Sequence, residues 1–137
     1  MGTKKFIYDN YLKNIDSNIS YRLELSDALF GILNSGVVPI LAHPKEIQDE
    51  FNVDILKFIE VLTKKWIAGI EVYNSIHSLL NSCNYQYIAN QFGLLTTGGS
   101  DYHGLIVKRK VDLGSTTTEK IKIYKKDINF FDDKGCN

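Results

Sequence analysis

The chain has 137 residues, of which 44% are apolar and 23% are charged, and its formal net charge at pH 7 is zero. These values exclude the disordered and membrane-spanning classes and predict one globular domain over residues 1–137. The zero net charge also argues against a protein that holds long nucleic acids by electrostatics alone.

Compartment is indicated by the cysteines and by the N-terminal residues. Cys83 and Cys136 form no CxxC pair and are too few for a disulfide framework, which favours a reducing compartment. The N-terminal segment lacks the apolar stretch of a secretory signal, and no apolar run approaches the ~20 residues of a membrane span. We therefore expect a cytoplasmic protein with no membrane partner.

The pattern of the chain from Ser26 onward predicts the α/β class. A helix-period stretch is followed by a short apolar run that ends on a polar residue, and this order occurs three times. Such repetition is typical of helices that alternate with parallel strands. The first unit predicts a helix that begins at Ser26 and ends at Gly36, then a strand over 37–42 that leads to His43.

The second and third units follow the same order. In the second, Asn52 or Asp54 caps a helix, and an apolar run over 67–72 follows it. In the third, a helix over 78–91 closes at Gly93 and precedes a strand over 94–97. This helix is expected to bury one face, which comprises Leu80, Tyr87, Ile88 and Cys83. Residues 1–25 are expected to form an irregular lead-in, and residues 120–131 to contain a terminal strand.

The residues that could carry chemistry follow the strand ends. His43 follows the first strand, Glu71 lies near the end of the second, and Asp101 and His103 follow the third. In parallel α/β proteins these ends gather at one edge, where ligand sites form. A carboxylate and two imidazoles suit zinc, iron or manganese, so His43, Asp101 and His103 are predicted metal ligands. The alternative is that each is an ordinary loop residue that caps a helix or a turn.

Further residues are candidates for substrate contacts. An unpaired Glu71 would be costly in an apolar strand, so it is expected to meet a cation or backbone donors, or else to form a salt bridge at the sheet rim. His77 and Tyr102 are predicted to face a substrate, although His77 could simply be a helix-entry residue. The candidates for phosphate contacts are the basic residues Arg22, Lys45, Lys108 and Arg109, most of which are expected to be solvated.

Four segments together resemble a known family. Residues 37–44 (VVPILAHP), 67–78 (IAGIEVYNSIHS), 92–104 (FGLLTTGGSDYHG) and 111–115 (VDLGS) resemble the later motifs of PHP (polymerase and histidinol phosphatase) phosphoesterases, in the nucleoside 3',5'-bisphosphate phosphatase branch. The resemblance covers residues 20–115. It implies a distorted (β/α)7 barrel with divalent manganese, zinc or iron, and hydrolysis of nucleotide or oligonucleotide phosphates by a metal-activated water.

The departure from that family is equally informative. Complete members carry an early His-x-His motif, whereas no histidine precedes His43 here, and a closed barrel needs about 200 residues or more. The chain is therefore expected to be a C-terminal fragment, a partial (β/α) barrel, that binds metal weakly and is inactive alone. A missing N-terminal half or a homodimer partner would complete it, because open strand edges favour pairing.

Three functional hypotheses remain open at this point. The chain is the C-terminal portion of a metal-dependent phosphoesterase, or a non-catalytic remnant that acts as a binding or assembly domain. A third hypothesis is an unrelated mononuclear metal hydrolase, in which Glu71 would have to join the same site as a fourth donor.

Overall fold

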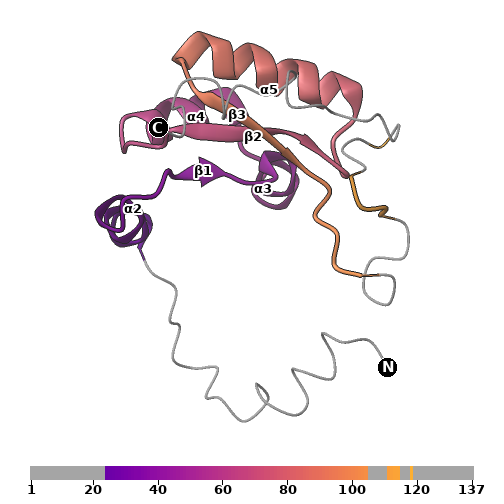
Figure 1. Ribbon diagram of the computed structural model, residues 1–137. Coiled ribbons are helices and arrows are strands. Elements are labelled where there is room, and N and C mark those ends of the chain that lie inside the picture. Colours follow the sequence, from indigo (N-terminus) through magenta and orange to yellow (C-terminus); the bar gives the residue numbers. More distant parts are fainter. Residues whose placement is uncertain (1–23, 105–110, 115–117, 119–137) are drawn as a thin grey trace.

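The computed structural model describes residues 24–104, 111–114 and 118. In chain order the elements are α2 (Leu25–Asn34), β1 (Ile40–Leu41), α3 (Pro44–Phe51), α4 (Ile55–Thr63), β2 (Gly69–Asn74), α5 (Leu79–Phe92) and β3 (Leu95–Gly99). The three strands form a parallel sheet in the order β1-β2-β3 (Figure 1). The predicted α/β class and parallel strands are confirmed.

The predicted partial barrel is corrected to an open sheet. Within the described residues three strands pair side by side, and β2 is central. β1 is shorter than the predicted strand over 37–42, since its register gives it only two partners, Ile40 with Gly69 and Leu41 with Ile70. The pairing of β2 with β3 is longer and runs from Gly69–Leu95 to Asn74–Gly99.

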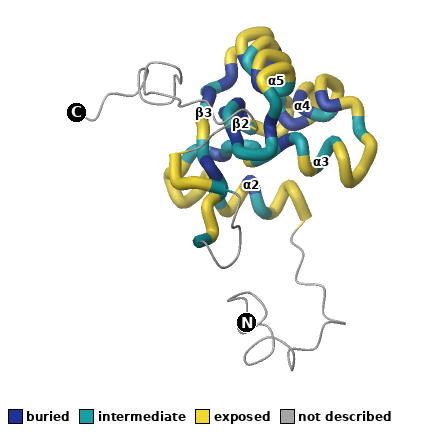
Figure 2. Tube along the Cα trace, turned by 90° about the vertical axis from the view of Figure 1, so that its right-hand side faces the viewer, coloured by how far each residue is buried: buried dark blue, intermediate teal, exposed yellow. Residues whose placement is uncertain are grey.

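The core lies where α4 and α5 meet the sheet. Ile70 and Val72 of β2 are fully buried, as is Ile59 of α4. The remaining buried members of this core are Ile55, Tyr85, Ile88, Ala89 and Leu94. Figure 2 shows the buried segments gathered on β2 and on the inner sides of α4 and α5, while the outer sides of these helices are exposed. Burial of this apolar area is the main source of stability for the fold.

Helix ends are set by local side chains as well as by packing. Asp54 caps α4 by accepting hydrogen bonds from the backbone N–H groups of Leu56 and Lys57. Ser78 and Asn81 form a capping box at the start of α5, and Gly93 ends that helix with φ of 63°. Asp54 and Gly93 agree with the predicted helix ends, whereas the predicted N-cap Ser26 is wrong, because α2 starts at Leu25 with Glu24 as its N-cap.

Three of the four predictions of burial on α5 are wrong. Leu80 is 79% exposed and Tyr87 is 66% exposed, and Cys83 is also exposed. The inward face consists of Ser82, Tyr85, Ile88 and Ala89. Small side chains at two of these positions let α5 approach the sheet closely, so the buried face follows shape rather than hydrophobicity alone.

Within the described segments, no helix is long and apolar enough to cross a membrane. The predicted strand within residues 120–131 lies outside the described residues, as does nearly all of the predicted lead-in over 1–25.

Candidate functional site

Three loops meet at the C-terminal edge of the sheet. β1 leads to His43, β2 carries Glu71 and ends on Asn74, and β3 runs through Gly99 toward Asp101. A register shift between Glu71 and Tyr73 marks a β-bulge in β2 at this edge. Bulges re-aim side chains next to functional sites, and here the bulge lies beside the predicted residues.

Glu71 joins two of these loops. Its Oε2 accepts a hydrogen bond of 2.8 Å from the backbone N–H of His43 and another of 2.8 Å from Nδ2 of Asn74. Burial raises the pKa of the Glu71 carboxyl, an effect that these two hydrogen bonds oppose and the negative charge of Asp101 reinforces. The predicted backbone donors are therefore present, and the predicted alternative of a salt bridge is not formed by the described residues.

His43 occupies a strained position at the start of α3. Its backbone lies in the left-handed region, with φ of 30° and ψ of 61°, which non-glycine residues rarely adopt. The ring is half-buried, and its Nδ1 lies 3.1 Å from Oε2 of Glu46. Pro44 takes the first position of α3, where its missing N–H costs nothing. The hydrogen bond to Glu71 is what holds this strained turn against the central strand.

Asp101 and His103 form a carboxylate–imidazole pair. Oδ1 of Asp101 lies 2.8 Å from Nε2 of His103, and their side chains are 25% and 43% exposed. Asp101 has φ of 49°, so this loop also departs from ordinary backbone geometry. Tyr102 between them is exposed. A carboxylate that orients an imidazole is a common arrangement for proton transfer and for metal ligation.

His77 lies behind this edge rather than on it. The ring is fully buried and meets Tyr85 edge to face, with ring centroids 4.9 Å apart. Its Nδ1 lies 2.9 Å from the carbonyl oxygen of Val72, and because a carbonyl only accepts, Nδ1 must carry the proton. Nε2 has no hydrogen-bond partner among the residues that the structure describes. Burial lowers the pKa of His77, which favours the neutral form of the ring. A contact between His77 and a substrate stays a prediction.

The donor types at this edge fit a divalent metal ion, but their arrangement does not complete a site. Carboxylates and imidazoles suit manganese, zinc or iron. However, no three His, Cys, Asp or Glu side chains among the described residues group closely enough to hold a metal. The predicted ligand set of His43, Asp101 and His103 therefore stays a prediction.

The predicted phosphate contacts are only partly placed. Lys45 is engaged on its own helix, where its Nζ lies 2.6 Å from Oδ1 of Asp49. Arg22, Lys108 and Arg109 lie outside the described residues. Sequence reasoning missed Asn74 and Gly99 as site residues. The signal for Asn74 was its place as a buried polar residue at the end of the central strand.

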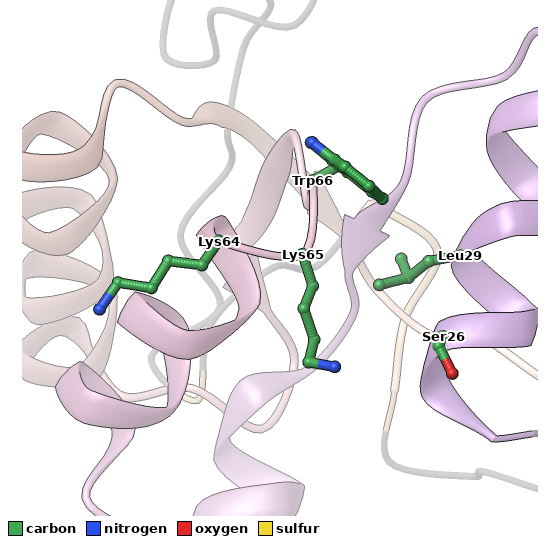
Figure 3. Close-up of a pocket in the computed structure, with 5 residues that line it drawn as sticks. All are labelled: Ser26, Leu29, Lys64, Lys65 and Trp66. Atoms are coloured by element: carbon green, nitrogen blue, oxygen red, sulfur yellow. The ribbon is translucent and has the colours of Figure 1, made fainter.

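A hollow of about 230 Å³ lies away from this edge and contains none of the predicted residues. It is lined by Ser26, Leu29, Lys64, Lys65 and Trp66 (Figure 3). Lys64 points away from Trp66 in this view, and its Nζ lies 2.9 Å from Oε1 of Glu60. Trp66 precedes β2, so the hollow belongs to the opposite end of the sheet from Glu71.

Comparison with known proteins identifies a distant relative but no matching family model. No family model matches the chain. The chain is 30% identical, over 101 residues, to the phosphoribosyl 1,2-cyclic phosphate 1,2-diphosphodiesterase of Eggerthella lenta. The aligned residues are 72% of this chain, and they span only 36% of that relative's length. The chain is thus distantly related to a phosphodiesterase, which is a hydrolase.

This comparison corrects the predicted family. The resemblance indicated a PHP phosphoesterase of the nucleoside 3',5'-bisphosphate branch, but no family model supports it, and the relative is named for a cyclic sugar phosphate. The four motifs are short, and a histidine or aspartate after a parallel strand arises in any fold that places ligands at that edge. The broad expectation of a phosphoesterase relationship is confirmed, whereas the PHP assignment and its barrel are not retained.

Proposed function

We propose that this chain forms part of the active site of a phosphodiesterase that acts on a small phosphate ester. The observation that carries the proposal is the convergence of Glu71, Asp101 and His103 at the C-terminal edge of a parallel sheet, in a chain related to a phosphodiesterase. The relative's name points to a cyclic sugar phosphate as the first substrate to test.

Electrostatics at this edge support a role for a divalent cation. A phosphate diester is an anion, and the charges of Glu71 and Asp101 would repel it. Lys45, the basic residue nearest in sequence to His43, is paired with Asp49. A divalent metal held by Asp101, His103 and His43, with further donors from outside the described residues, would offset this repulsion and lower the pKa of a bound water.

The pair of Asp101 and His103 has a defined part in this proposal. The carboxylate fixes the orientation of the ring, because Nε2 is held at 2.8 Å from Oδ1. The side chain of His103 is partly exposed, so it can meet a ligand at the edge. Glu71, whose pKa is raised, would become a better proton acceptor than an ordinary carboxylate.

Hydrolysis by the purified chain tests the proposal. The chain is freed of metal with a chelator, supplied with manganese or zinc, and assayed with bis(4-nitrophenyl) phosphate, 4-nitrophenyl phosphate and 5-phosphoribosyl 1,2-cyclic phosphate. We expect diester hydrolysis that falls by about 100-fold or more in D101N. The matched control is D49N, which removes an exposed carboxylate of α3 and should leave the rate unchanged.

Since the chain spans 36% of the relative, the same assay is repeated with a chimera in which the 101 aligned residues of this chain replace those of the relative. Hydrolysis by the chimera that depends on Asp101 supports the proposal even where the chain alone is slow. Loss of hydrolysis in a folded chimera, with metal bound, would contradict it.

A second function is favoured by a specific observation. Asp101 and His103 bind each other, and the described residues form no group of three metal-binding side chains. A non-catalytic domain that retains the scaffold and binds a partner would show this arrangement. A folded chimera without hydrolysis and without metal binding would support this second function.

A further inference from the structure

We infer that Asn74 is a positioning residue that sets the orientation of the Glu71 carboxylate and, through it, the turn at His43. The inference deepens the proposed function and rests on it for its catalytic consequence. Its structural part rests on two hydrogen bonds of the Glu71 carboxylate, from Asn74 and from His43, and on the space beside this carboxylate at Gly99.

The first step is the burial and bonding of Asn74. The residue is 1% exposed, and both ends of its amide are engaged. Nδ2 donates to Oε2 of Glu71 at 2.8 Å, and Oδ1 accepts from the backbone N–H of Ile76 at 3.1 Å. The second bond fixes which end of the amide faces Glu71, so the group presented to the carboxylate is always a donor.

The second step is that the two carboxylate oxygens of Glu71 have different contacts. Oε2 receives both donors, from Asn74 and from the backbone of His43. Neither of these two bonds involves Oε1. A carboxylate that is held by one oxygen keeps the other for a ligand, while its rotation is restricted by the two bonds to its partner oxygen.

The third step is the space that Gly99 leaves for Oε1. A Cβ placed on Gly99 would lie 2.9 Å from Oε1 of Glu71, closer than real contacts allow. Gly99 is the register partner of Asn74. The two neighbouring strands therefore act on opposite oxygens of one carboxylate: Asn74 of β2 holds Oε2, and Gly99 of β3 gives Oε1 its room.

The β-bulge explains how Asn74 reaches Glu71. In a regular strand, residues three apart point to opposite faces of the sheet. The register shift between Glu71 and Tyr73 interrupts this alternation and lets the two side chains meet. The strained backbone of His43 then donates a hydrogen bond to a carboxylate that Asn74 has already fixed.

Two variants separate positioning from chemistry. N74L keeps the approximate shape of the side chain and removes the donor, so we expect the amide hydrogen of His43 to exchange about tenfold faster with solvent, as measured by NMR. E71Q keeps an oxygen that can accept both bonds, so exchange at His43 should stay within about threefold of the parent chain. The control is N84L, on the exposed side of α5, which should change neither.

Kinetic constants distinguish a positioning role of Asn74 from a purely structural one, which would leave them unchanged. In the assay of the proposed function, N74L should lower kcat by about tenfold with KM within about twofold, whereas E71Q should abolish hydrolysis despite intact exchange protection at His43. G99A approaches the same carboxylate from the other strand and should reproduce both effects of N74L. It therefore decides the matter if N74L does not fold.

Unchanged exchange at His43 in folded N74L and folded G99A would overturn the inference, whatever the kinetics. Loss of His43 protection in E71Q equal to that in N74L would also overturn it, because the acceptor oxygen would then not be what Asn74 positions. If the parent chain and the chimera show no hydrolysis, the proposed function fails, while the exchange measurements still decide the role of Asn74.

Discussion

Gly69 lies at a position in the sheet that has no room for a Cβ atom. A Cβ added there would lie 2.5 Å from Cδ1 of Ile40 on one neighbouring strand and 2.7 Å from the carbonyl oxygen of Leu95 on the other. Ordinary van der Waals contact begins near 3.4 Å, so G69A demands a movement of more than half an ångström on both sides of the central strand. The Ile40 side chain can turn, but the carbonyl of Leu95 belongs to the backbone of β3 and cannot move alone.

The magnitude follows from two opposing effects. Overpacking of this kind costs about 1–3 kcal/mol. Replacing a glycine within a strand recovers about 0.5–1 kcal/mol of backbone entropy. We therefore expect G69A to lower the free energy of unfolding by about 1–2 kcal/mol and to lower Tm by about 4 °C or more.

Urea denaturation, followed by circular dichroism, measures this difference against a matched control. Gly31 lies within α2, and a Cβ there would meet nothing within 4 Å, so G31A should instead raise stability by about 0.5–1 kcal/mol through helix propensity. If G69A is as stable as the parent chain while G31A behaves as expected, the close approach of the three strands at Gly69 is refuted.

Further predictions concern pH, capping and a strained turn. Because burial raises the pKa of Glu71, stability should fall as pH rises above its ordinary value of 4.5, and E71Q should remove that fall in pH-dependent urea denaturation. Because burial lowers the pKa of His77, stability should fall as pH drops below 6.5, and H77N, whose amide can still donate to Val72, should remove this second dependence. S78A should lower the free energy of unfolding by about 1 kcal/mol in the same assay, since it breaks the capping box of α5, and an unchanged midpoint would contradict that box. Trp66 has φ of 69° and is 72% exposed at a helix end that favours glycine, so W66G should raise the free energy of unfolding by about 0.5–1 kcal/mol in the same assay, and a loss of stability would contradict this.

Sequence patterns predicted the elements whose signals are local. Asp54, as one of two candidate caps, and Gly93, as the closing glycine, were recognised because capping depends on the residue type at one position, and the third helix was predicted to begin at Ser78. Helix α3 was missed, since its eight residues carry few apolar side chains, although Pro44 at its first position was a start signal. The inward face of α5 was misread because apolar residues such as Leu80 and Tyr87 lie on its exposed side, and periodicity cannot choose between two faces.

The sequence predicted which edge of the sheet carries the candidate site, but it did not predict the contacts between the site residues. Parallel topology alone places His43, Glu71 and Asp101 at the ends of neighbouring strands. The bulge in β2 has no signature in the sequence, and without it Asn74 and Glu71 would be expected on opposite faces. The family was misassigned for a related reason. Short motifs show which residues follow a strand, and unrelated folds can place the same residues after their strands.

The bulge also divides β2 into a part that sets stability and a part that sets the site. Before it, Gly69 and Ile70 keep regular register with both neighbours, and Ile70 is fully buried in the core. At and after it, Asn74 donates a hydrogen bond to Glu71, which carries a carboxylate whose burial is unfavourable. A buried charge that lowers stability is typically retained because it has a function. We therefore expect E71Q to be more stable than the parent chain at neutral pH and also less active. A variant that lost stability on this substitution would show that the Glu71 network stabilises the fold and would remove the main structural reason for placing chemistry there.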